Sequence, residues 1–316
     1  MKTIRISRNN DAKISNISAA TIGHYDGVHL GHQYVLRCLH SCADERGVSE
    51  TMVITFDRHP RMLFDTSYRP NMLTTIEERL EYLEQCGIDT CVVLEFDEAM
   101  ASLSARDFMQ EILRDRLGVR MLLLGYDNHF GRRKVGEGFD DYRRYGEEMG
   151  IEVVPCDGIA MPDGTHYSST VVRRLLAEGH CQQAMQCLGR PYSLRGIVVE
   201  GYHEGRKMGF PTANISVDPL KVIPVGGVYA VKVKIEGYEG TFLGMMNIGH
   251  RPTYGTYSLT IETNIFHFDD DIYGKTLEVF LYKKMREERR FESVEALIGQ
   301  LRQDACDAER YLMAWG

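Results

Sequence analysis

Residues 20–33 have the sequence ATIGHYDGVHLGHQ, in which a short apolar run leads into a glycine-rich turn and then into an amphipathic stretch. In a parallel α/β sheet, such a junction lies outside the carboxyl end of a strand, where the free N–H groups of the following helix attract anions. His29 and His32 stand three positions apart at the start of the predicted helix, so they share one face. The stretch predicts a site where both imidazoles donate hydrogen bonds to phosphate oxygens and Gly31 permits close approach to the backbone.

The sequence around this junction alternates apolar runs with amphipathic segments. Three runs are continuously apolar, as is typical of strands covered on both faces, at residues 52–56, 91–94 and 121–124. Amphipathic segments that indicate helices lie near residues 30–46, 76–86 and 103–116. Because strands that alternate with helices form βαβ units, we expect residues 1–185 to fold as one doubly wound, Rossmann-like α/β domain with a parallel sheet.

The second part of the chain has a different pattern. Apolar and polar residues alternate over short segments, at residues 197–199, 228–235, 241–243 and 277–281. Turns that contain glycine, such as residues 236–240, separate these segments at the intervals of antiparallel structure. Residues 186–316 are therefore predicted to form an antiparallel β-barrel, with a terminal helix over residues 293–315 that packs on it.

Composition restricts the class of protein. The chain has 316 residues, of which 43% are hydrophobic and 26% are charged, as in a soluble globular protein with two domains. No run of about 18 apolar residues is long enough to span a bilayer. The first residues have no apolar core of a secretory signal, so we expect the protein in the cytoplasm.

Charge and cysteine content disfavour two further classes of ligand. A net charge of −8 argues against a broad surface for DNA or RNA, because that mode of binding needs many lysines and arginines. The eight cysteines are scattered without a C-x-x-C pair, so we expect reduced thiols and no zinc site. A local basic cluster is still sufficient for one small anionic ligand.

The two histidines leave alternatives open. Their spacing alone also fits unrelated residues at a surface or at a helix cap. A zinc helix is disfavoured, because the Glu of H-E-x-x-H is absent and no third ligand has a suitable spacing. The three glycines and the Asp26 carboxylate that accompany the histidines at the junction favour the phosphate site.

Four segments together resemble a known family. Residues 23–32, GHYDGVHLGH, resemble the G-x-[FY]-D-G-x-H-x-G-H segment of the HxGH nucleotidyltransferases, in the form found in bacterial bifunctional riboflavin kinase/FAD synthetases. Three later segments follow in that family's order: TFDRHP at 55–60, GYDNHFG at 125–131 and SSTVVR at 168–173. The resemblance implies an FMN adenylyltransferase in residues 1–185, in which the phosphate of FMN attacks the α-phosphorus of ATP and FAD and pyrophosphate result.

The resemblance also implies roles for individual residues in this domain. ATP contacts are assigned to His29, His32, Gly23, Asp26, Gly31, Asp127, Ser169, Thr170 and Arg173. Flavin contacts are assigned to His59 and Pro60. The residues themselves allow a second interpretation, because a hydroxyl pair ahead of an amphipathic stretch is also an ordinary helix cap with a solvated arginine.

Residues 205–214, GRKMGFPTAN, form a glycine-rich basic segment that ends in a proline turn. Backbone N–H groups of such a loop can surround phosphates, and threonine and asparagine oxygens suit a hard Mg²⁺ ion. The segment resembles the G-R-x-[LM]-G-F-P-T-A-N signature of riboflavin kinases, and NIGHRPT at 247–253 and DIYG at 271–274 resemble two further segments of that family. This resemblance assigns the nucleotide to Gly205, Lys207 and Gly209, and Mg²⁺ to Thr212 and Asn214.

The remaining candidates in the barrel are a carboxylate and an arginine. Glu262 lies on an alternating strand, where a charge usually faces solvent, but the resemblance makes it the base that accepts the proton of the ribityl 5′-hydroxyl. Arg286 lies in MREERRF, which resembles a segment beside the flavin site and equally fits a surface charge run. The chain departs from the family pattern at three positions, His24, Asn128 and Asn264.

We therefore expect an enzyme that converts riboflavin to FMN in the barrel and FMN to FAD in the N-terminal domain, using Mg²⁺ and ATP. Its predicted partners are these small substrates, without a nucleic acid, a membrane or an obligate protein partner. The alternatives are an enzyme with only one live activity, a flavin- or nucleotide-binding sensor without turnover, and an RNA-binding HxGH protein, which the acidic charge disfavours.

Overall fold

The protein is described by a computed structural model. It covers residues 1–7, 13–14, 18–65, 67–125, 130–132, 136–162, 164–201, 204–253 and 256–315, with the backbone alone at 204, 250–253 and 256–258. The chain divides into two compact units, Met1–Ser168 and Ser169–Gly316. The predicted division into functional domains at 185 and 186 stays a prediction, because compactness does not test where each reaction takes place.

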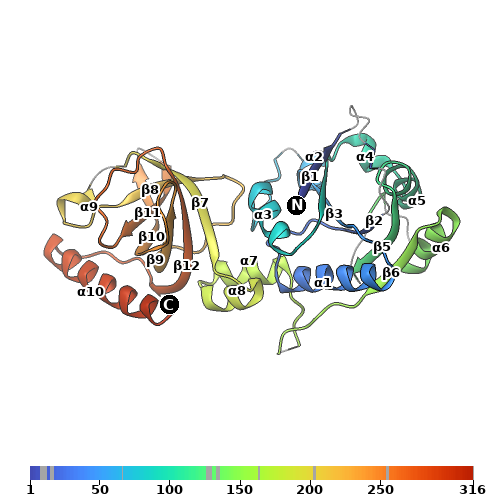
Figure 1. Ribbon diagram of the computed structural model, residues 1–316. Coiled ribbons are helices and arrows are strands. Elements are labelled where there is room, and N and C mark those ends of the chain that lie inside the picture. The colour runs from blue at the N-terminus through green and yellow to red at the C-terminus, as the bar shows by residue number, and fades with distance from the viewer. Residues whose placement is uncertain are drawn as a thin grey trace. The chain divides into compact units, whose positions relative to one another are not determined.

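The N-terminal unit contains a sheet of six parallel strands (Figure 1). In spatial order these are β1 (Lys2–Ile6), β4 (Thr90–Leu94), β3 (Thr51–Phe56), β2 (Ser18–Ile22), β5 (Val119–Gly125) and β6 (Glu152–Cys156). The chain runs from β2 outward through β3 to β4 and then crosses back to β5 on the other side of β2. Ligands of such sheets bind at this switch point, outside the carboxyl ends of the strands.

Helices cover both faces of this sheet. The side chain of Val53 packs on the side of α1 (Leu30–Glu45) and α3 (Ile76–Gln85), and its neighbours Met52 and Ile54 pack on the opposite side. That opposite face is covered by α5 (Ala105–Asp107), the π-helix η1 (Phe108–Arg114) and α6 (Phe139–Met149). Burial on both faces explains the continuous apolar runs and confirms the doubly wound prediction.

Some local predictions differ from the structure. The single helix expected near residues 103–116 is a short α5 followed by the π-helix η1. Strand β1 was not predicted; it lies at the sheet edge and pairs with β4. Two short helices, α2 (Arg61–Phe64) and α4 (Glu98–Ser102), follow β3 and β4.

The C-terminal unit contains a closed antiparallel barrel, as predicted (Figure 1). Around the barrel its strands are β10 (Phe242–Thr253), β11 (Thr256–Ile265), β8 (Ala213–Val217), β7 (Tyr192–Val199), β12 (Thr276–Arg286) and β9 (Gly227–Ile235). Helices α7 (Ser169–Ala177) and α8 (Cys181–Leu188) precede it, and the short α9 (Glu204–Lys207) lies between β7 and β8. Strand β8 was not predicted. Asn214, which the sequence placed at the end of a loop, lies on this strand.

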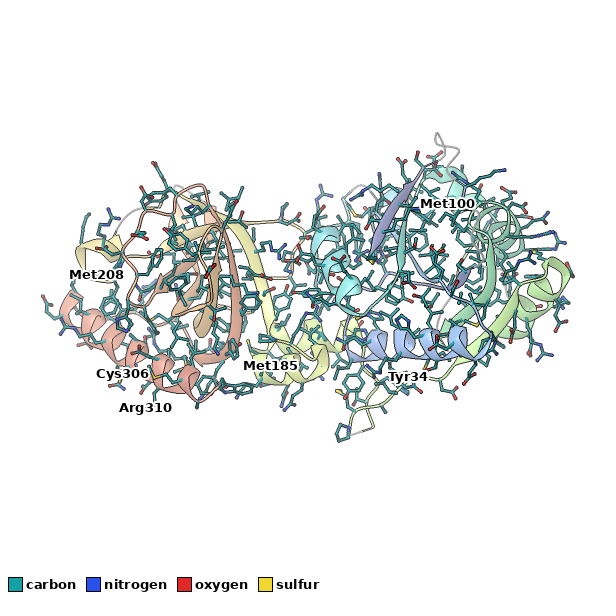
Figure 2. The ribbon with its side chains drawn as sticks, in the orientation of Figure 1. Tyr34, Met100, Met185, Met208, Cys306 and Arg310 are labelled. Atoms are coloured by element: carbon teal, nitrogen blue, oxygen red, sulfur yellow. The ribbon has the colours of Figure 1, made fainter. Side chains whose placement is uncertain are left out.

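The terminal helix α10 (Val294–Met313) packs one face on the barrel. Ala308 and Leu312 are buried against strand residues, whereas Cys306 and Arg310, labelled in Figure 2, lie on its exposed side. This confirms the predicted terminal helix. Among the helices in the described ranges, none combines the length and the apolar character needed to cross a membrane.

Candidate active sites

His29 ends the loop that follows β2 and is the N-cap residue of α1. Its Nδ1 accepts a hydrogen bond from the backbone N–H of His32 at 3.3 Å, and the two imidazole rings stack with centroids 3.6 Å apart. The His29 side chain is buried. Because Nδ1 is an acceptor here, the neutral ring carries its proton on Nε2, so Nε2 is the nitrogen of this ring that can donate.

The loop before His29 has a strained backbone. Gly27 has a φ of 85°, and two residues that are not glycine, Tyr25 and Val28, have φ values of 50° and 37°. A β-branched residue in this region is energetically unfavourable, and such strain is concentrated at functional sites of proteins. The loop therefore holds an unusual conformation directly before the capping histidine.

Asp26 connects this loop to the segment before α3. Its buried carboxylate accepts hydrogen bonds from the backbone N–H groups of Leu73 and Thr74, at 3.1 and 3.0 Å, and from the Thr74 hydroxyl at 3.2 Å. The Thr74 hydroxyl oxygen in turn accepts the N–H of Gly27 at 3.1 Å. Through these bonds the Asp26 carboxylate binds the residues that precede α3. Its contact with a nucleotide stays a prediction.

Gly31 makes room for side chains of the protein itself. A Cβ atom at this position would lie 3.1 Å from the His29 ring and 3.1 Å from the Cβ of Tyr167. At Gly23, a Cβ would lie 3.2 Å from the Tyr25 ring. Both glycines predicted to contact a nucleotide therefore also allow the loop and the histidine stack to pack closely.

An aromatic row follows the carboxyl ends of β2 and β3. The His24 ring stacks on the His59 ring with centroids 5.2 Å apart, and the Tyr68 ring lies 5.3 Å beyond His59. The Nδ1 of His59 accepts the N–H of Arg61 at 3.2 Å, and Pro60 directly precedes α2. We call His24, His59 and Tyr68 the aromatic row; the Arg61 guanidinium lies over the Tyr68 ring, 4.4 Å from its centroid.

A buried arginine, which sequence reasoning missed, lies beneath this row. Arg79 on α3 is 2% exposed, and its Nη1 donates to the Thr55 hydroxyl at 3.2 Å and to the Phe56 carbonyl at 3.1 Å. The Thr55 hydroxyl donates to the His24 carbonyl at 3.2 Å. Burial, and then the positive charge of Arg79, lower the pKa of His24 to about 4, so its ring is neutral at pH 7. No motif marked Arg79, because its helix has an ordinary amphipathic pattern.

In the barrel, three adjacent strands bring predicted residues together. The Thr212 hydroxyl donates to a Glu262 carboxylate oxygen at 3.5 Å. On β11, Glu262 stands opposite Asn214 of β8 on one side and opposite Asn247 of β10 on the other. The Asn214 side chain lies against Gly201, where a Cβ would come within 2.1 Å of its amide nitrogen. The predicted base and the two predicted metal ligands therefore form one cluster.

Two cavities meet at this cluster. The larger has a volume of about 270 Å³ and is lined by Glu262, Asn264 and Arg286 together with apolar side chains. The smaller has a volume of about 70 Å³ and is lined by Arg206, Thr263 and the carboxylates of residues 269–271 together with apolar side chains. Residues alternate in direction along β11, so Glu262 and Asn264 face the larger cavity and Thr263 faces the smaller one. Thr212 lines both cavities and therefore lies at their junction.

The glycines of the basic segment shape its turn. A Cβ at Gly205 would lie 2.3 Å from the Phe210 carbonyl oxygen, and Gly209 has a φ of 79°, which favours glycine. Lys207 is exposed at the end of α9. Asn264, noted in the sequence only as a departure, is buried and donates its amide to the Pro211 carbonyl at 2.7 Å.

The remaining candidates lie elsewhere. Ser169 and Thr170 are the first two residues of α7, and Arg173 follows one turn later in the same helix. All three belong to the second compact unit. Asp127 and Asn128 lie outside the described residues.

Known proteins resemble this chain along almost its whole length. The FAD synthetase family model matches residues 11–171, and the riboflavin kinase family model matches residues 188–312. Two curated relatives are bifunctional riboflavin kinase/FMN adenylyltransferases. The one from Buchnera aphidicola is 35% identical over 98% of this chain and 99% of its own, and the one from Escherichia coli K12 is 37% identical over 98% of each.

A solved structure has the same fold. It is a crystal structure described as a macrolide-efflux protein from Streptococcus pneumoniae, with a TM-score of 0.87 and 29% sequence identity. The match covers 96% of this chain and 97% of that one.

His24 should make the stability of the N-terminal unit depend on pH. Between pH 6.5 and about 4 the unfolded chain binds a proton at His24, whereas the folded ring stays neutral, so the free energy of unfolding should fall as the pH is lowered through this range. The His24→Phe variant should lose this part of the dependence. Denaturant unfolding at several pH values measures it, with the exposed His166→Phe as the control. Equal pH profiles for the parent chain and His24→Phe would contradict the assignment.

Proposed function

This chain belongs to the bifunctional riboflavin kinase/FMN adenylyltransferase family, and on that premise we propose which residues carry its two reactions. The C-terminal part phosphorylates riboflavin to FMN, and the N-terminal part adenylylates FMN to FAD, with ATP as the second substrate of both. The observation that carries the proposal is the cluster of Glu262 and Thr212 at the junction of two cavities.

Glu262 is the general base of the kinase reaction. Riboflavin occupies the larger cavity, whose apolar wall suits the isoalloxazine ring, and ATP binds toward the smaller cavity, which Arg206 and Thr212 line. The Glu262 carboxylate accepts the proton of the ribityl 5′-hydroxyl while that oxygen attacks the γ-phosphorus. A bond forms from the ribityl oxygen to phosphorus, the bond to the β-phosphate oxygen breaks, and ADP leaves.

Thr212 and Asn214 hold Mg²⁺ in this scheme. The hydroxyl of Thr212 and the amide oxygen of Asn214, next to the Glu262 carboxylate, form an all-oxygen donor set of the kind that a hard cation prefers. Mg²⁺ bound here neutralises the charge of the nucleotide phosphates. Gly205, Lys207 and Gly209 stay predicted contacts of the same phosphates: Lys207 offers an exposed cation, and the two glycines allow the turn, which closes through the N–H groups of Met208, Gly209 and Phe210.

In the adenylyltransferase reaction, His29 and His32 donate hydrogen bonds to ATP phosphates. The stack of their rings and the cap bond to Nδ1 of His29 orient these donors in advance, which is the condition for electrostatic stabilisation of a transition state. A phosphate oxygen of FMN attacks the α-phosphorus, the bond to the β-phosphate breaks, and pyrophosphate leaves without a covalent enzyme intermediate. Gly23, Asp26 and Gly31 shape this loop.

The flavin and the pyrophosphate have separate candidate contacts. The flavin ring of FMN is assigned to the end of the aromatic row at His59 and Pro60, in the turn after β3, where an aromatic surface suits a planar ring. Ser169, Thr170 and Arg173 stay predicted phosphate ligands, supported by the family pattern, by the place of Ser169 and Thr170 at the start of α7 and by that of Arg173 one turn later. Asp127 stays a predicted nucleotide ligand on the sequence pattern alone.

We also propose a cytoplasmic location, because both reactions consume ATP. The substrates riboflavin, FMN and ATP are the partners that these reactions require. Neither reaction calls for a nucleic acid, a membrane or a second protein.

Glu262→Gln should separate the two activities. The amide cannot accept a proton, so FMN formation from riboflavin and Mg-ATP should fall about a hundredfold or more. FAD formation from added FMN should stay unchanged. Chromatography of both flavin products measures the two rates in one sample, and an unchanged kinase rate would exclude Glu262 as the base.

His29→Ala and His32→Ala should have the opposite effect. Loss of one preorganised donor is expected to slow FAD formation about a hundredfold, with FMN formation spared. Gly31→Ala should act in the same direction, because its Cβ would press on the His29 ring. Gly299→Ala is the matched control, because a Cβ there meets nothing within 4 Å. Loss of both activities in the histidine variants would contradict the separate sites.

Asn264→Leu should slow the kinase by removing the bond that holds the Pro211 carbonyl just before Thr212. We expect about a tenfold loss in kcat/KM, the size expected for one buried hydrogen bond and its unpaired acceptor. Asn264→His, which restores the residue usual in the family, should retain most activity if its ring reaches the same carbonyl. Steady-state FMN formation measures both variants, and a fully active Asn264→Leu would rule out this role.

A further inference from the structure

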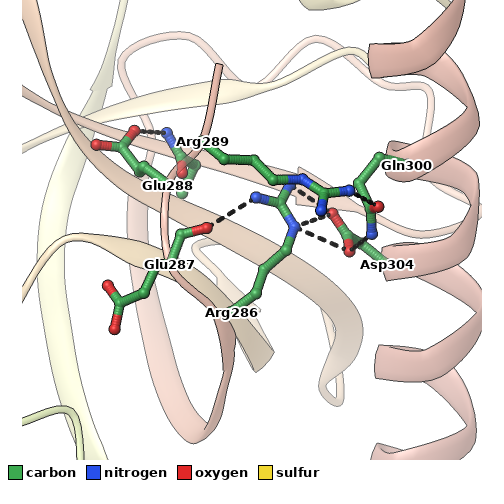
Figure 3. Close-up of polar contacts among 7 residues, drawn as sticks. Arg286, Glu287, Glu288, Arg289, Gln300 and Asp304 are labelled. Carbon is green, nitrogen blue, oxygen red and sulfur yellow. Dashed lines mark hydrogen bonds and ion pairs between the residues drawn. The ribbon is translucent and has the colours of Figure 1, made fainter. Parts of the chain in front are cut away.

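The guanidinium of Arg286 is held by a carboxylate from a different element. Asp304 of α10 accepts two hydrogen bonds from the Arg286 Nε, at 3.1 and 2.9 Å, and one from its Nη2 at 2.7 Å (Figure 3). The Nη1 donates to the Glu287 carbonyl at 3.0 Å. The Asp304 side chain is only 5% exposed, and Gln300 donates a further bond to it at 2.7 Å.

This pairing leaves part of the guanidinium without an acceptor. Arginine has five N–H donors in a fixed plane. Asp304 takes the Nε donor and one Nη2 donor, and the Glu287 carbonyl takes one Nη1 donor. One N–H on each terminal nitrogen of Arg286 therefore makes no hydrogen bond within the part of the chain that the structure describes.

Arg286 lines the larger cavity, whereas Asp304 and Gln300 are not among its lining residues. The centroid of the Phe291 ring lies 5.8 Å from the Arg286 guanidinium and 5.0 Å from the Arg289 guanidinium. Phe291 and Arg289 also line the cavity. Arg289 in turn donates to Gln300 (Figure 3). Two residues of α10 thus hold two cationic side chains of the cavity wall from behind.

The pair needs an explanation other than stability. A buried ion pair loses hydration on folding, so it contributes little more than well-packed apolar residues of the same size. The ion pair also has a geometric effect, because a bidentate carboxylate fixes the plane of a guanidinium that would otherwise rotate freely. The clear consequence of the Asp304 contact is therefore the orientation of Arg286 in the cavity wall.

We propose that Asp304 is a positioning residue of the riboflavin cavity, which orients Arg286 so that its two remaining N–H groups meet a carbonyl oxygen of the flavin ring and the ring nitrogen beside it. The inference rests on the proposed function of the larger cavity. The two carbonyl oxygens of a flavin flank the N3–H donor, and each also has a ring-nitrogen acceptor beside it, N1 next to the C2 oxygen and N5 next to the C4 oxygen. A guanidinium fork fixed in one plane fits such an adjacent pair of acceptors, and the apolar cavity wall covers the rest of the ring.

The test compares full-length variants in riboflavin binding and in turnover. Asp304→Asn and Arg286→Met should each raise the riboflavin Kd, followed by flavin fluorescence, and the riboflavin KM by about tenfold, the loss expected for hydrogen bonds from a charged donor. The kcat should change less than threefold. In the double variant, Asp304→Asn should add no further loss to that of Arg286→Met.

Two further variants control for folding and for charge. Asp307→Asn removes a carboxylate from the same helix that pairs with Arg310, and it should leave riboflavin binding unchanged. Arg286→Lys keeps a cation beside Asp304 but loses the planar fork, so it should weaken riboflavin binding without a large fall in the unfolding temperature. FAD formation from added FMN should be normal in every variant.

Several results would overturn the inference. An unchanged riboflavin Kd in Asp304→Asn would overturn it. The same holds if the increase in Kd of the double variant equals the product of the two single increases, because Asp304 would then act independently of Arg286 and only stabilise α10. A normal Kd in Arg286→Lys would also exclude the fork. Failure of the parent chain to form FMN would instead refute the proposed function, and the parent chain is assayed first for that reason.

Discussion

The hydrogen bond from the N–H of His32 to Nδ1 of His29 satisfies a requirement of every helix, because the first N–H groups of a helix have no partner within it. Here an imidazole meets that requirement in place of the usual hydroxyl or carboxylate. The choice fixes the ring proton on the outer nitrogen and brings the two imidazoles into a stack. The strained loop and the buried Asp26 carboxylate hold His29 where it can serve as the cap.

In the barrel, the alternation of side chains along β11 determines which residues line which cavity. Because side chains of a strand point alternately to its two sides, one short segment of β11 lines both cavities. Glu262 faces the cavity that we assign to riboflavin, and Thr263 faces the one that we assign to the nucleotide. Thr212, held 3.5 Å from Glu262 by the pairing of neighbouring strands, lies where a phosphoryl group would pass between them.

Behind each site lies a buried charged residue that holds site residues in place without lining the site itself. Arg79 holds the carboxyl end of β3 and, after burial, is the second cause of the lowered pKa of His24, and Asp304 holds Arg286. Neither arrangement follows from a local pattern, because each joins residues on separate elements. Such contacts decide how accurately the visible site residues are oriented.

The sequence by itself determined the fold class, because periodicity records strand burial locally, and its long motifs indicated the family. Through that resemblance it also singled out Glu262, Thr212 and Asn214, whose roles stay predictions. Only the tertiary structure decided that His29 caps α1, that Asp26 binds the backbone before α3, and that Arg79 and Asp304 lie buried behind the sites. Strands β1 and β8 escaped prediction for the same reason, since an edge strand and a strand after a proline turn depend on their partners. Pairing between distant segments leaves no periodic signal in either of them.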